Sequence, residues 1–212
     1  MAPLGEDYST LESIRETGGV RPDATWESNR AAAAENAAIA QRMGLSLVTM
    51  HAGCVPERLD DPLRRRMIAR LREVAEIFGS HGVRVAFETG QDSAATMLGV
   101  LTELHDLGVG VNFDPANVLL YGSGDPIESM RALSGWIVQT HLKEARRSRE
   151  VGAWGEEVRA GRGEVDWDAY FGVLASLESR VDVVIEREAG ESRVEDVRAG
   201  AALARRYMGA GA

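Results

Sequence analysis

The sequence predicts a parallel α/β domain, either an open doubly wound sheet or a (β/α) barrel. Five short, mostly apolar runs rich in β-branched residues are spaced along the chain, and amphipathic helical patterns lie between them. Short apolar runs are typical of parallel strands covered by helices. Strand–helix alternation repeated five times indicates a parallel sheet. The expected strands are residues 45–50, 83–87, 109–113, 137–140 and 181–185.

The helices between these strands are marked by their first residues. In two places an aspartate precedes a proline, Asp61-Pro62 and Asp125-Pro126, which places a capping carboxylate before a proline at the first helical position. Apolar residues at helical spacing follow each predicted cap. The predicted caps are Asp61, Ser93, Asp125 and Asp166. An alanine-rich helix is expected over residues 25–43 and a last helix over residues 192–207.

The composition is that of a soluble globular protein, with 44% hydrophobic and 27% charged residues, and we expect one domain over residues 1–212. A net charge of −9 disfavours nucleic acid as a partner. The arginine clusters at residues 64–66 and 146–149 are interpreted as solvated faces or helix ends. Cys54 is the only cysteine, which excludes an intrachain disulfide and a thiolate-rich zinc site. No run approaches the ~18 apolar residues of a membrane span, so a cytoplasmic location is expected.

A side chain suited to metal binding or acid–base chemistry follows each predicted strand. In chain order these residues are His51, Glu88, Asp114, His141 and Glu186. In barrel enzymes the active site lies at this carboxyl-terminal rim, so we expect them to lie close together. Three neighbouring carboxylates would raise one another's pKa unless a cation neutralised them. Glu88, Asp114, His141 and Glu186 offer three oxygens and one imidazole, which suits one divalent ion per chain, Mn²⁺ or Mg²⁺ first and Co²⁺ or Zn²⁺ as alternatives.

The segments LVTMHAG, VAFETG, VGVNFDPAN, VQTHLKE and VVIERE resemble the sugar phosphate isomerase/epimerase family, the xylose-isomerase-like TIM barrels. The resemblance extends over nearly the whole chain, including GEDYSTLESIRETGG and GRGEVDW. It implies a TIM-barrel type of fold and a metal held by a Glu, an Asp, a His and a second Glu from the last four strands. The matching residues here are Glu88, Asp114, His141 and Glu186. The resemblance also implies a small keto sugar, sugar phosphate or related hydroxy-carbonyl compound as substrate.

The chemistry that the resemblance implies agrees with the residue types. Moving hydrogen between carbons beside a carbonyl needs a base and an acid. A metal that chelates the carbonyl and a neighbouring hydroxyl stabilises the resulting enediolate. The resemblance implies that Glu88 and Glu186 both bind the metal and transfer the proton. Some relatives shift a hydride instead, and both routes stay open.

Further residues near the strand ends are predicted to contact the substrate. They are His51, Asn117, Lys143, Arg147 and Trp154. Asn117 stands three residues after Asp114, where some relatives carry a histidine, and its amide can still bind a hydroxyl. Lys143 and Arg147 could meet a phosphate or another substrate oxygen. Trp154 lies in a long stretch that could act as a lid over the site.

Five strands are fewer than the eight of a closed TIM barrel, and GEDYST resembles the family segment that follows the third strand. We therefore expect a barrel that is incomplete on its N-terminal side, with an edge that a second copy of the chain could cover. The leading prediction is a metal-dependent isomerase or epimerase of carbohydrates. One alternative is a non-catalytic metal- or sugar-binding remnant of the barrel. Another is a divalent-metal DNA-repair endonuclease of the same architecture, which needs more strand-end histidines than His51 and His141.

Overall fold

The computed structural model describes residues 1–209, and all five predicted strands form in it. They are β1 (Leu47–Met50), β2 (Arg84–Glu88), β3 (Gly110–Phe113), β4 (Ile137–Leu142) and β7 (Asp182–Ile185). A separate two-stranded antiparallel ribbon, which the sequence analysis did not predict, consists of β5 (Glu144–Arg146) and β6 (Glu156–Val158). The observed β4 is two residues longer than predicted, so that His141 lies inside the strand and not after it.

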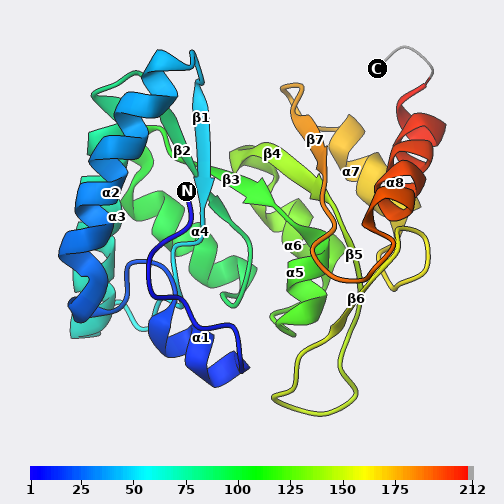
Figure 1. Cartoon of the computed structure of the whole chain (residues 1–212), viewed down its shortest axis with the longest axis horizontal. Coiled ribbons are helices and arrows are strands. Elements are labelled where there is room, and N and C mark those ends of the chain that lie inside the picture. Colours follow the sequence, from blue (N-terminus) through cyan, green and yellow to red (C-terminus); the bar gives the residue numbers. More distant parts are fainter. Residues whose placement is uncertain (210–212) are drawn as a thin grey trace.

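The five predicted strands form one fully parallel sheet in the order β1-β2-β3-β4-β7 (Figure 1). Each strand therefore pairs with the next of these five along the chain. Strands β1 and β7 form the two edges, and among residues 1–209 no strand joins them. The structure is thus an incomplete TIM barrel with an open sheet.

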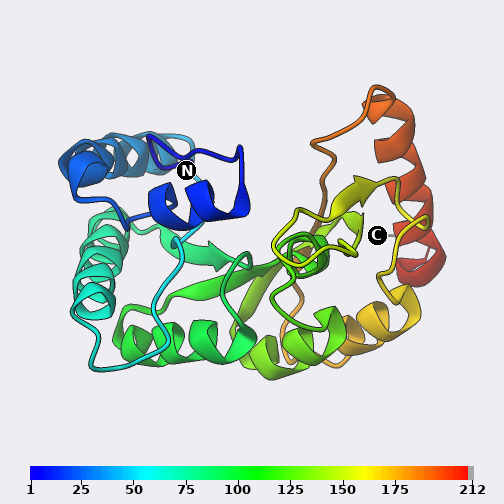
Figure 2. The same cartoon turned by 90° about the horizontal axis from the view of Figure 1, so that it is seen from below.

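Eight helices accompany the strands in the described part of the chain. They are α1 (Leu11–Thr17), α2 (Asp23–Arg42), α3 (Pro62–Gly79), α4 (Ala94–Glu103), α5 (Pro115–Leu120), α6 (Pro126–Leu133), α7 (Trp167–Ala175) and α8 (Arg193–Met208), with 3₁₀ turns at His105–Leu107 and Ser134–Trp136. Figure 2 shows α3, α4, α6 and α7 as a curved row along one face of the sheet. None of the helices in residues 1–209 combines the length and the apolar character that crossing a membrane requires.

All four predicted caps accept hydrogen bonds from the first turns of their helices. The bonds are Leu63 N to Asp61, Thr96 N to Ser93, Ile127 and Glu128 N to Asp125, and Ala169 N to Asp166. Two short helices, α1 and α5, were not predicted. The first begins with a reciprocal capping box between Thr10 and Ser13. The second begins at a third Asp-Pro pair, Asp114-Pro115.

The arginine cluster at residues 64–66 corrects one expectation. Arg65 and Arg66 are exposed, but Arg64 is only 1% exposed. Its guanidinium donates to Glu103 Oε1 through Nε (3.0 Å) and Nη2 (2.6 Å) and to the Pro56 carbonyl (2.8 Å). A buried charge needs such partners. Arg64 therefore joins α3 to the end of α4, and its interpretation as part of a solvated face was wrong.

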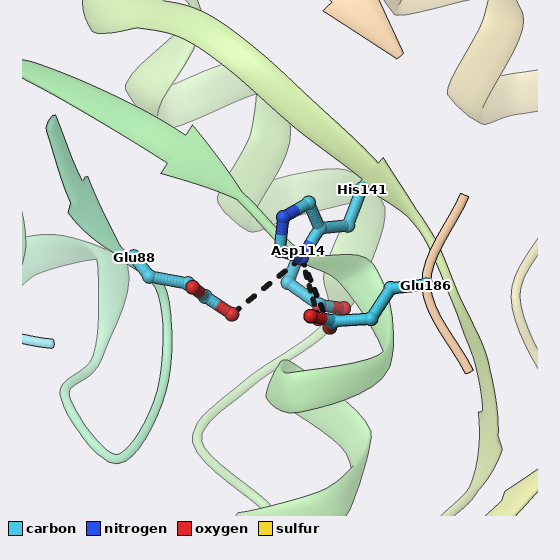
Figure 3. A group of neighbouring side chains, drawn as sticks. All are labelled: Glu88, Asp114, His141 and Glu186. Carbon is cyan, nitrogen blue, oxygen red and sulfur yellow. Dashed lines mark hydrogen bonds and ion pairs between the residues drawn. The ribbon is translucent and has the colours of Figure 1, made fainter. Parts of the chain in front are cut away.

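The carboxyl ends of β2, β3, β4 and β7 lie along one edge of the sheet. Figure 3 shows the side chains of Glu88, Asp114, His141 and Glu186 converging there. These residues come from four successive positions across the parallel sheet, which explains how segments far apart in the sequence meet.

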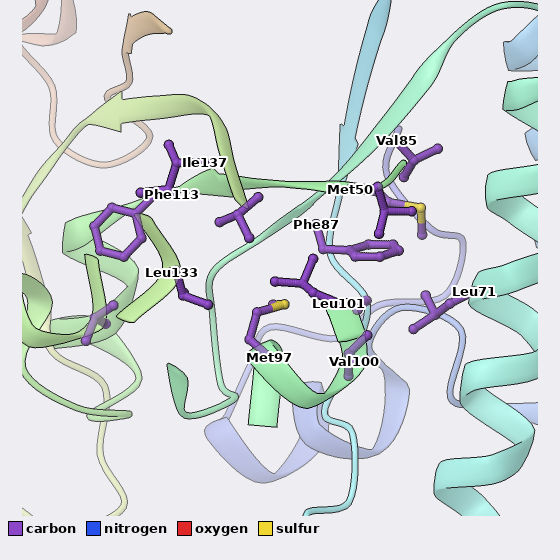
Figure 4. Close-up of a cluster of buried hydrophobic side chains, with 14 of the residues drawn as sticks. Met50, Leu71, Val85, Phe87, Met97, Val100, Leu101, Phe113, Leu133 and Ile137 are labelled. Atoms are coloured by element: carbon purple, nitrogen blue, oxygen red, sulfur yellow. The ribbon is translucent and has the colours of Figure 1, made fainter. Parts of the chain in front are cut away.

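The hydrophobic core lies between the sheet and its row of helices. Side chains from β2 and β3, such as Phe87 and Phe113, pack there with helix residues that include Leu71, Leu101 and Leu133, and all five are 0% exposed (Figure 4). Each such side chain contributes about 1.5–3 kcal/mol through burial. The strands that carry the converging side chains therefore rest on a well-packed layer.

Candidate metal centre

Four side chains bring one potential ligand atom each to within 4.8 Å of one another, and they are the four that the sequence analysis selected. His141 Nδ1 stands at the centre of the group (Figure 3). It lies 3.5 Å from Glu88 Oε1, 3.3 Å from Asp114 Oδ2 and 3.1 Å from Glu186 Oε2. The arrangement could hold a single metal ion.

The two carboxylate oxygens of Asp114 have different roles, since one caps a helix and the other faces the candidate metal site. Its Oδ1 accepts the backbone N–H groups of Ala116 (2.8 Å) and Asn117 (3.1 Å) and so caps α5. Its Oδ2 faces His141. The backbone of Asp114 is fixed as well, because its N–H donates to the Thr89 hydroxyl (2.8 Å), which in turn donates to the Asp114 carbonyl (3.0 Å). The residue is 0% exposed, so the second oxygen has a defined direction.

Glu88, the last residue of β2, is held by two neutral amides. Asn117 Nδ2 donates to its Oε1 (3.0 Å), and Asn112 Nδ2 lies 3.3 Å from its Oε2. Burial raises the pKa of Glu88, while nearby His51 opposes that shift. The imidazoles of His141 (3.5 Å) and His51 (3.9 Å) are the nearest cationic groups to Glu88, and the raised pKa shows that they do not offset burial, so a bound cation would add missing positive charge.

The imidazole of His141 is oriented from its other side by Asn112. Its Nε2 lies 2.9 Å from the Asn112 amide nitrogen. The Asn112 Oδ1 atom has no partner, and it is the only such buried side-chain atom in residues 1–209. Turning the amide over would place Oδ1 against Nε2–H at the expense of the Asn112 contact with Glu88 Oε2, and once the imidazole is neutral its Nδ1 lone pair would be available to a metal ion. A histidine that ligates a metal is commonly oriented in this way.

The protonation of His141 depends strongly on its acidic neighbours. Burial disfavours its positive charge, but hydrogen bonds with Asp114 and Glu186 outweigh burial and raise its pKa to about 10. Burial alone would raise the pKa of Glu186, whereas the His141 hydrogen bond and the charge of Lys143 lower it. A divalent cation can replace the His141 proton among these carboxylates. The donor set of three carboxylates and one imidazole therefore fits such an ion.

Lys143 is a buried cation beside the four candidate ligands. It is 2% exposed, and its ammonium donates to Glu186 Oε2 (2.9 Å), to Glu188 and to Asn117 Oδ1 (3.4 Å). Burial alone would lower the pKa of Lys143, but the charges of Asp114 and Glu186 raise it. The predicted substrate residues Asn117 and Lys143 thus lie among the ligands and contact each other.

The other three predicted substrate residues lie farther out. His51 lines a small cavity together with Glu88, Tyr8 and Tyr121, and its Nε2 is 3.9 Å from Glu88 Oε1. The Trp154 ring packs on Tyr121 with 4.8 Å between ring centroids. Arg147 donates to the Gly124 carbonyl and lines an open cleft with Tyr121. Tyr121 therefore lies beside all three, because it lines the cavity of His51 and the cleft of Arg147 and its ring contacts Trp154.

Sequence reasoning missed Asn112, Tyr121 and Glu188. Asn112 carried a recognisable signal, because it is the one polar residue in the otherwise apolar run VGVNF. Glu188 also carried a weak one, since it follows Glu186 at the spacing that keeps two side chains on one side of an extended segment. Tyr121 had no distinctive sequence context, because it reaches the cavity from the end of α5.

Comparison with known protein families shows the family to which the chain belongs. The family described as the xylose isomerase-like TIM barrel matches residues 14–207. The chain belongs to this family. A search among curated proteins gave no match.

Several solved structures share the fold of this chain. A xylose isomerase domain protein from Planctomyces limnophilus is 29% identical with a TM-score of 0.89, and the match covers 97% of this chain and 76% of that one. A xylose isomerase-like TIM barrel protein from Mycobacterium smegmatis in complex with magnesium is 19% identical, with a TM-score of 0.72 and coverage of 92% and 71%. L-ribulose 3-epimerase is 17% identical, with a TM-score of 0.65 and coverage of 90% and 69%. The last two likenesses concern the fold alone.

Proposed function

We propose that the chain binds one divalent metal ion through Glu88, Asp114, His141 and Glu186 and isomerises or epimerises a small keto sugar, sugar phosphate or related hydroxy-carbonyl compound. The observation that carries this proposal is the convergence of their four ligand atoms within 4.8 Å, with Glu88 and Glu186 approaching His141 from opposite sides (Figure 3). Solved structures with this fold include L-ribulose 3-epimerase and D-psicose 3-epimerase, which supports a reaction of this class.

The two glutamates supply the acid–base pair. Glu88 takes the proton from the carbon beside the carbonyl, and Glu186 returns a proton from the opposite side. Burial raises the pKa of Glu88, which brings it nearer to the range where a general base works at neutral pH. A bound divalent ion would polarise the substrate carbonyl and so make that proton more acidic.

The small cavity beside Glu88 is the proposed entrance to the reacting atoms. His51, Tyr8 and Tyr121 line it, and they offer an imidazole and two hydroxyl groups to a substrate rich in hydroxyls. His51 Nε2 faces Glu88 at 3.9 Å, so a hydroxyl bound by His51 would lie close to the proposed base.

The first test is the metal content of the purified protein after dialysis against Mn²⁺-containing and then Mn²⁺-free buffer. Asp114→Ala removes the Oδ2 ligand together with the α5 cap. Asp125→Ala is the matched control, because Asp125 also precedes a proline and its Oδ1 accepts two backbone N–H groups, both at 2.9 Å. We expect about one ion per chain in the parent and in Asp125→Ala, and none in Asp114→Ala.

Turnover is tested next with a panel of ketoses and ketose phosphates in the presence of Mn²⁺. Product formation that is lost in Glu88→Gln would support the proposed reaction. A folded parent that retains no metal would refute the metal centre. A parent that binds metal and converts none of the panel would favour a binding role over the proposed catalysis.

A further inference from the structure

The ribbon β5–β6 contacts the segment that carries Glu186. Ribbon residue Glu157 pairs with Ala145 in the antiparallel register, and its side chain is only 7% exposed. This side chain points away from its own ribbon to the residues that follow β7. The ribbon lies beside that segment in Figure 1 as well.

The segment after β7 no longer pairs with a strand, and the side chain of Glu157 accepts hydrogen bonds from two of its backbone N–H groups. Glu186 N–H still donates to the Leu142 carbonyl (3.2 Å), but residues 186–188 have no regular secondary structure. Glu157 Oε1 accepts the N–H of Glu188 (3.0 Å), and its Oε2 accepts the N–H of Ala189 (3.1 Å). One carboxylate thus binds two successive backbone amides, which lie two and three residues after Glu186.

Arg187 extends this attachment to α8. Its Nη1 donates to Glu157 Oε1 (2.8 Å), and its Nε donates to Asp196 Oδ2 (2.9 Å) in the first turn of α8. The side chains of Arg187 and Asp196 are 10% and 11% exposed, so this pairing is largely shielded from water. Buried charge-assisted hydrogen bonds of this kind are stronger than neutral ones.

We infer that Glu157 is a positioning residue for the metal ligand Glu186, acting through the backbone of residues 187–189. The inference rests on the proposed metal site. Glu186 and Glu188 flank Arg187 and both contact Lys143. A carboxylate that fixes Arg187 and the next two amides therefore restricts both partners of Lys143. Through Glu157, strand β6 therefore holds the segment that carries Glu186, the fourth proposed ligand.

The test compares Glu157→Gln with Glu156→Gln. Glutamine keeps the shape but loses the charge and one of the two acceptor oxygens. Glu156 is the neighbouring ribbon residue, and it pairs only with Arg146, with side-chain exposures of 69% and 49%. An exposed pair of this kind contributes little to stability. We expect Glu157→Gln to weaken Mn²⁺ binding by about 10–100-fold in calorimetry, and Glu156→Gln to leave it unchanged.

Amide hydrogen exchange of the metal-free protein gives a second readout. The amides of Glu188 and Ala189 should exchange at least about tenfold faster in Glu157→Gln than in the parent, because they lose a protecting acceptor. Val173→Ala in α7 serves as a control for general destabilisation, and it should lower the melting temperature without changing Mn²⁺ affinity. Unchanged affinity together with unchanged exchange in Glu157→Gln would overturn the inference.

If Glu157→Gln does not fold, Arg187→Lys replaces it, because a single ammonium cannot hold Glu157 and Asp196 in the same two-sided manner. Weaker Mn²⁺ binding in Arg187→Lys supports the inference, and parental binding overturns it. If the parent binds no Mn²⁺, the proposed function fails, and exchange at Glu188 and Ala189 alone then decides whether Glu157 holds the segment.

Discussion

The two sides of the metal centre are built differently. Asp114 and Glu88 are rooted in the middle of the sheet, with side chains 0% and 12% exposed, and neighbouring residues fix them directly. Glu186 follows the edge strand β7, its side chain is 29% exposed, and the ribbon supports its segment. A central strand positions its terminal side chain by pairing on both sides. An edge strand needs an additional element to achieve the same precision.

The two sides also differ in charge. Burial raises the pKa of Glu88, whose direct hydrogen bonds come from asparagine amides. Glu186 lies between two cations, His141 and Lys143, which lower its pKa despite partial burial. Without a metal ion, the charge of Glu88 is therefore less well compensated than that of Glu186, because both contact His141 but only Glu186 also pairs with Lys143 in the described part of the chain. The same ion would relieve repulsion on one side and displace a proton on the other.

The largest expected effect is the pH dependence of metal binding. Because the pKa of His141 is raised to about 10, its imidazole is protonated at neutral pH. The imidazole must lose that proton before it can bind a metal ion. Apparent Mn²⁺ affinity should therefore rise about tenfold per pH unit, or roughly 100-fold from pH 6 to 8. Calorimetry in buffers of different ionisation enthalpy measures the released proton. A flat affinity profile would contradict the assignment.

The same shift affects the stability of the metal-free protein with the opposite sign. The folded pKa of about 10 lies above the unfolded value of 6.5. The stabilisation from protonated His141 is therefore complete below pH 6.5 and is lost as the pH rises through about 10. His141→Asn should remove this part of the pH dependence of the melting temperature.

The next effect distinguishes the two glutamates in the metal-free protein. Glu186→Gln removes a charge that pairs with His141 and Lys143, so it should destabilise the protein by about 2 kcal/mol and lower the melting temperature by about 4–8 °C. Glu88→Gln removes a buried charge that shares His141 with two other carboxylates and lacks the Lys143 ion pair of Glu186, so it should lower the melting temperature less than Glu186→Gln does. Both variants should lose Mn²⁺ affinity. Calorimetric melting with a chelator present makes the comparison, and equal destabilisation by the two variants would refute it.

The smallest effect concerns Asn117. Its amide nitrogen donates both to Glu88 Oε1 and to the Thr89 carbonyl, each at 3.0 Å. If the amide mainly orients Glu88, Asn117→Ala should weaken Mn²⁺ binding by up to about tenfold, equivalent to about 1.4 kcal/mol. If it contacts the substrate, as its position after Asp114 suggested, the KM should rise and Mn²⁺ affinity should not change. Titration of the parent and of Asn117→Ala with Mn²⁺ and with substrate separates the two roles.

Much of this architecture could be predicted from the sequence because the signals are local. Short apolar runs identified the five strands, and Asp or Ser caps identified four helix starts. The convergence of Glu88, Asp114, His141 and Glu186 could be predicted because parallel strands bring their carboxyl ends together whatever the loops do, and the family resemblance singled out these four as the proposed metal ligands. The start of α5 was not predicted, although Asp114-Pro115 repeats the signal of Asp61-Pro62, because α5 is only six residues long and leaves little room for an apolar period.

The remaining features depend on contacts between distant segments. Arg64 is buried because Glu103 and the Pro56 carbonyl receive its donors, and no local pattern indicates that pairing. Likewise, the role of Glu157 becomes visible only when the ribbon meets the segment after β7. Periodicity shows which face of an element is apolar, but it does not show which polar side chains from other elements will meet there.

The order of the sheet bears on how the protein folds. Since every strand of the open sheet pairs with its neighbour among the five, the sheet can grow along the chain without first joining its two edges. Such a topology avoids the loop-closure entropy that a closed barrel must overcome to bring its first and last strands together. If the strands add in chain order, Glu88, Asp114 and His141 come together first, and the addition of β7 completes the set of four. High-affinity capture of a metal ion would therefore report the last step in assembling the sheet.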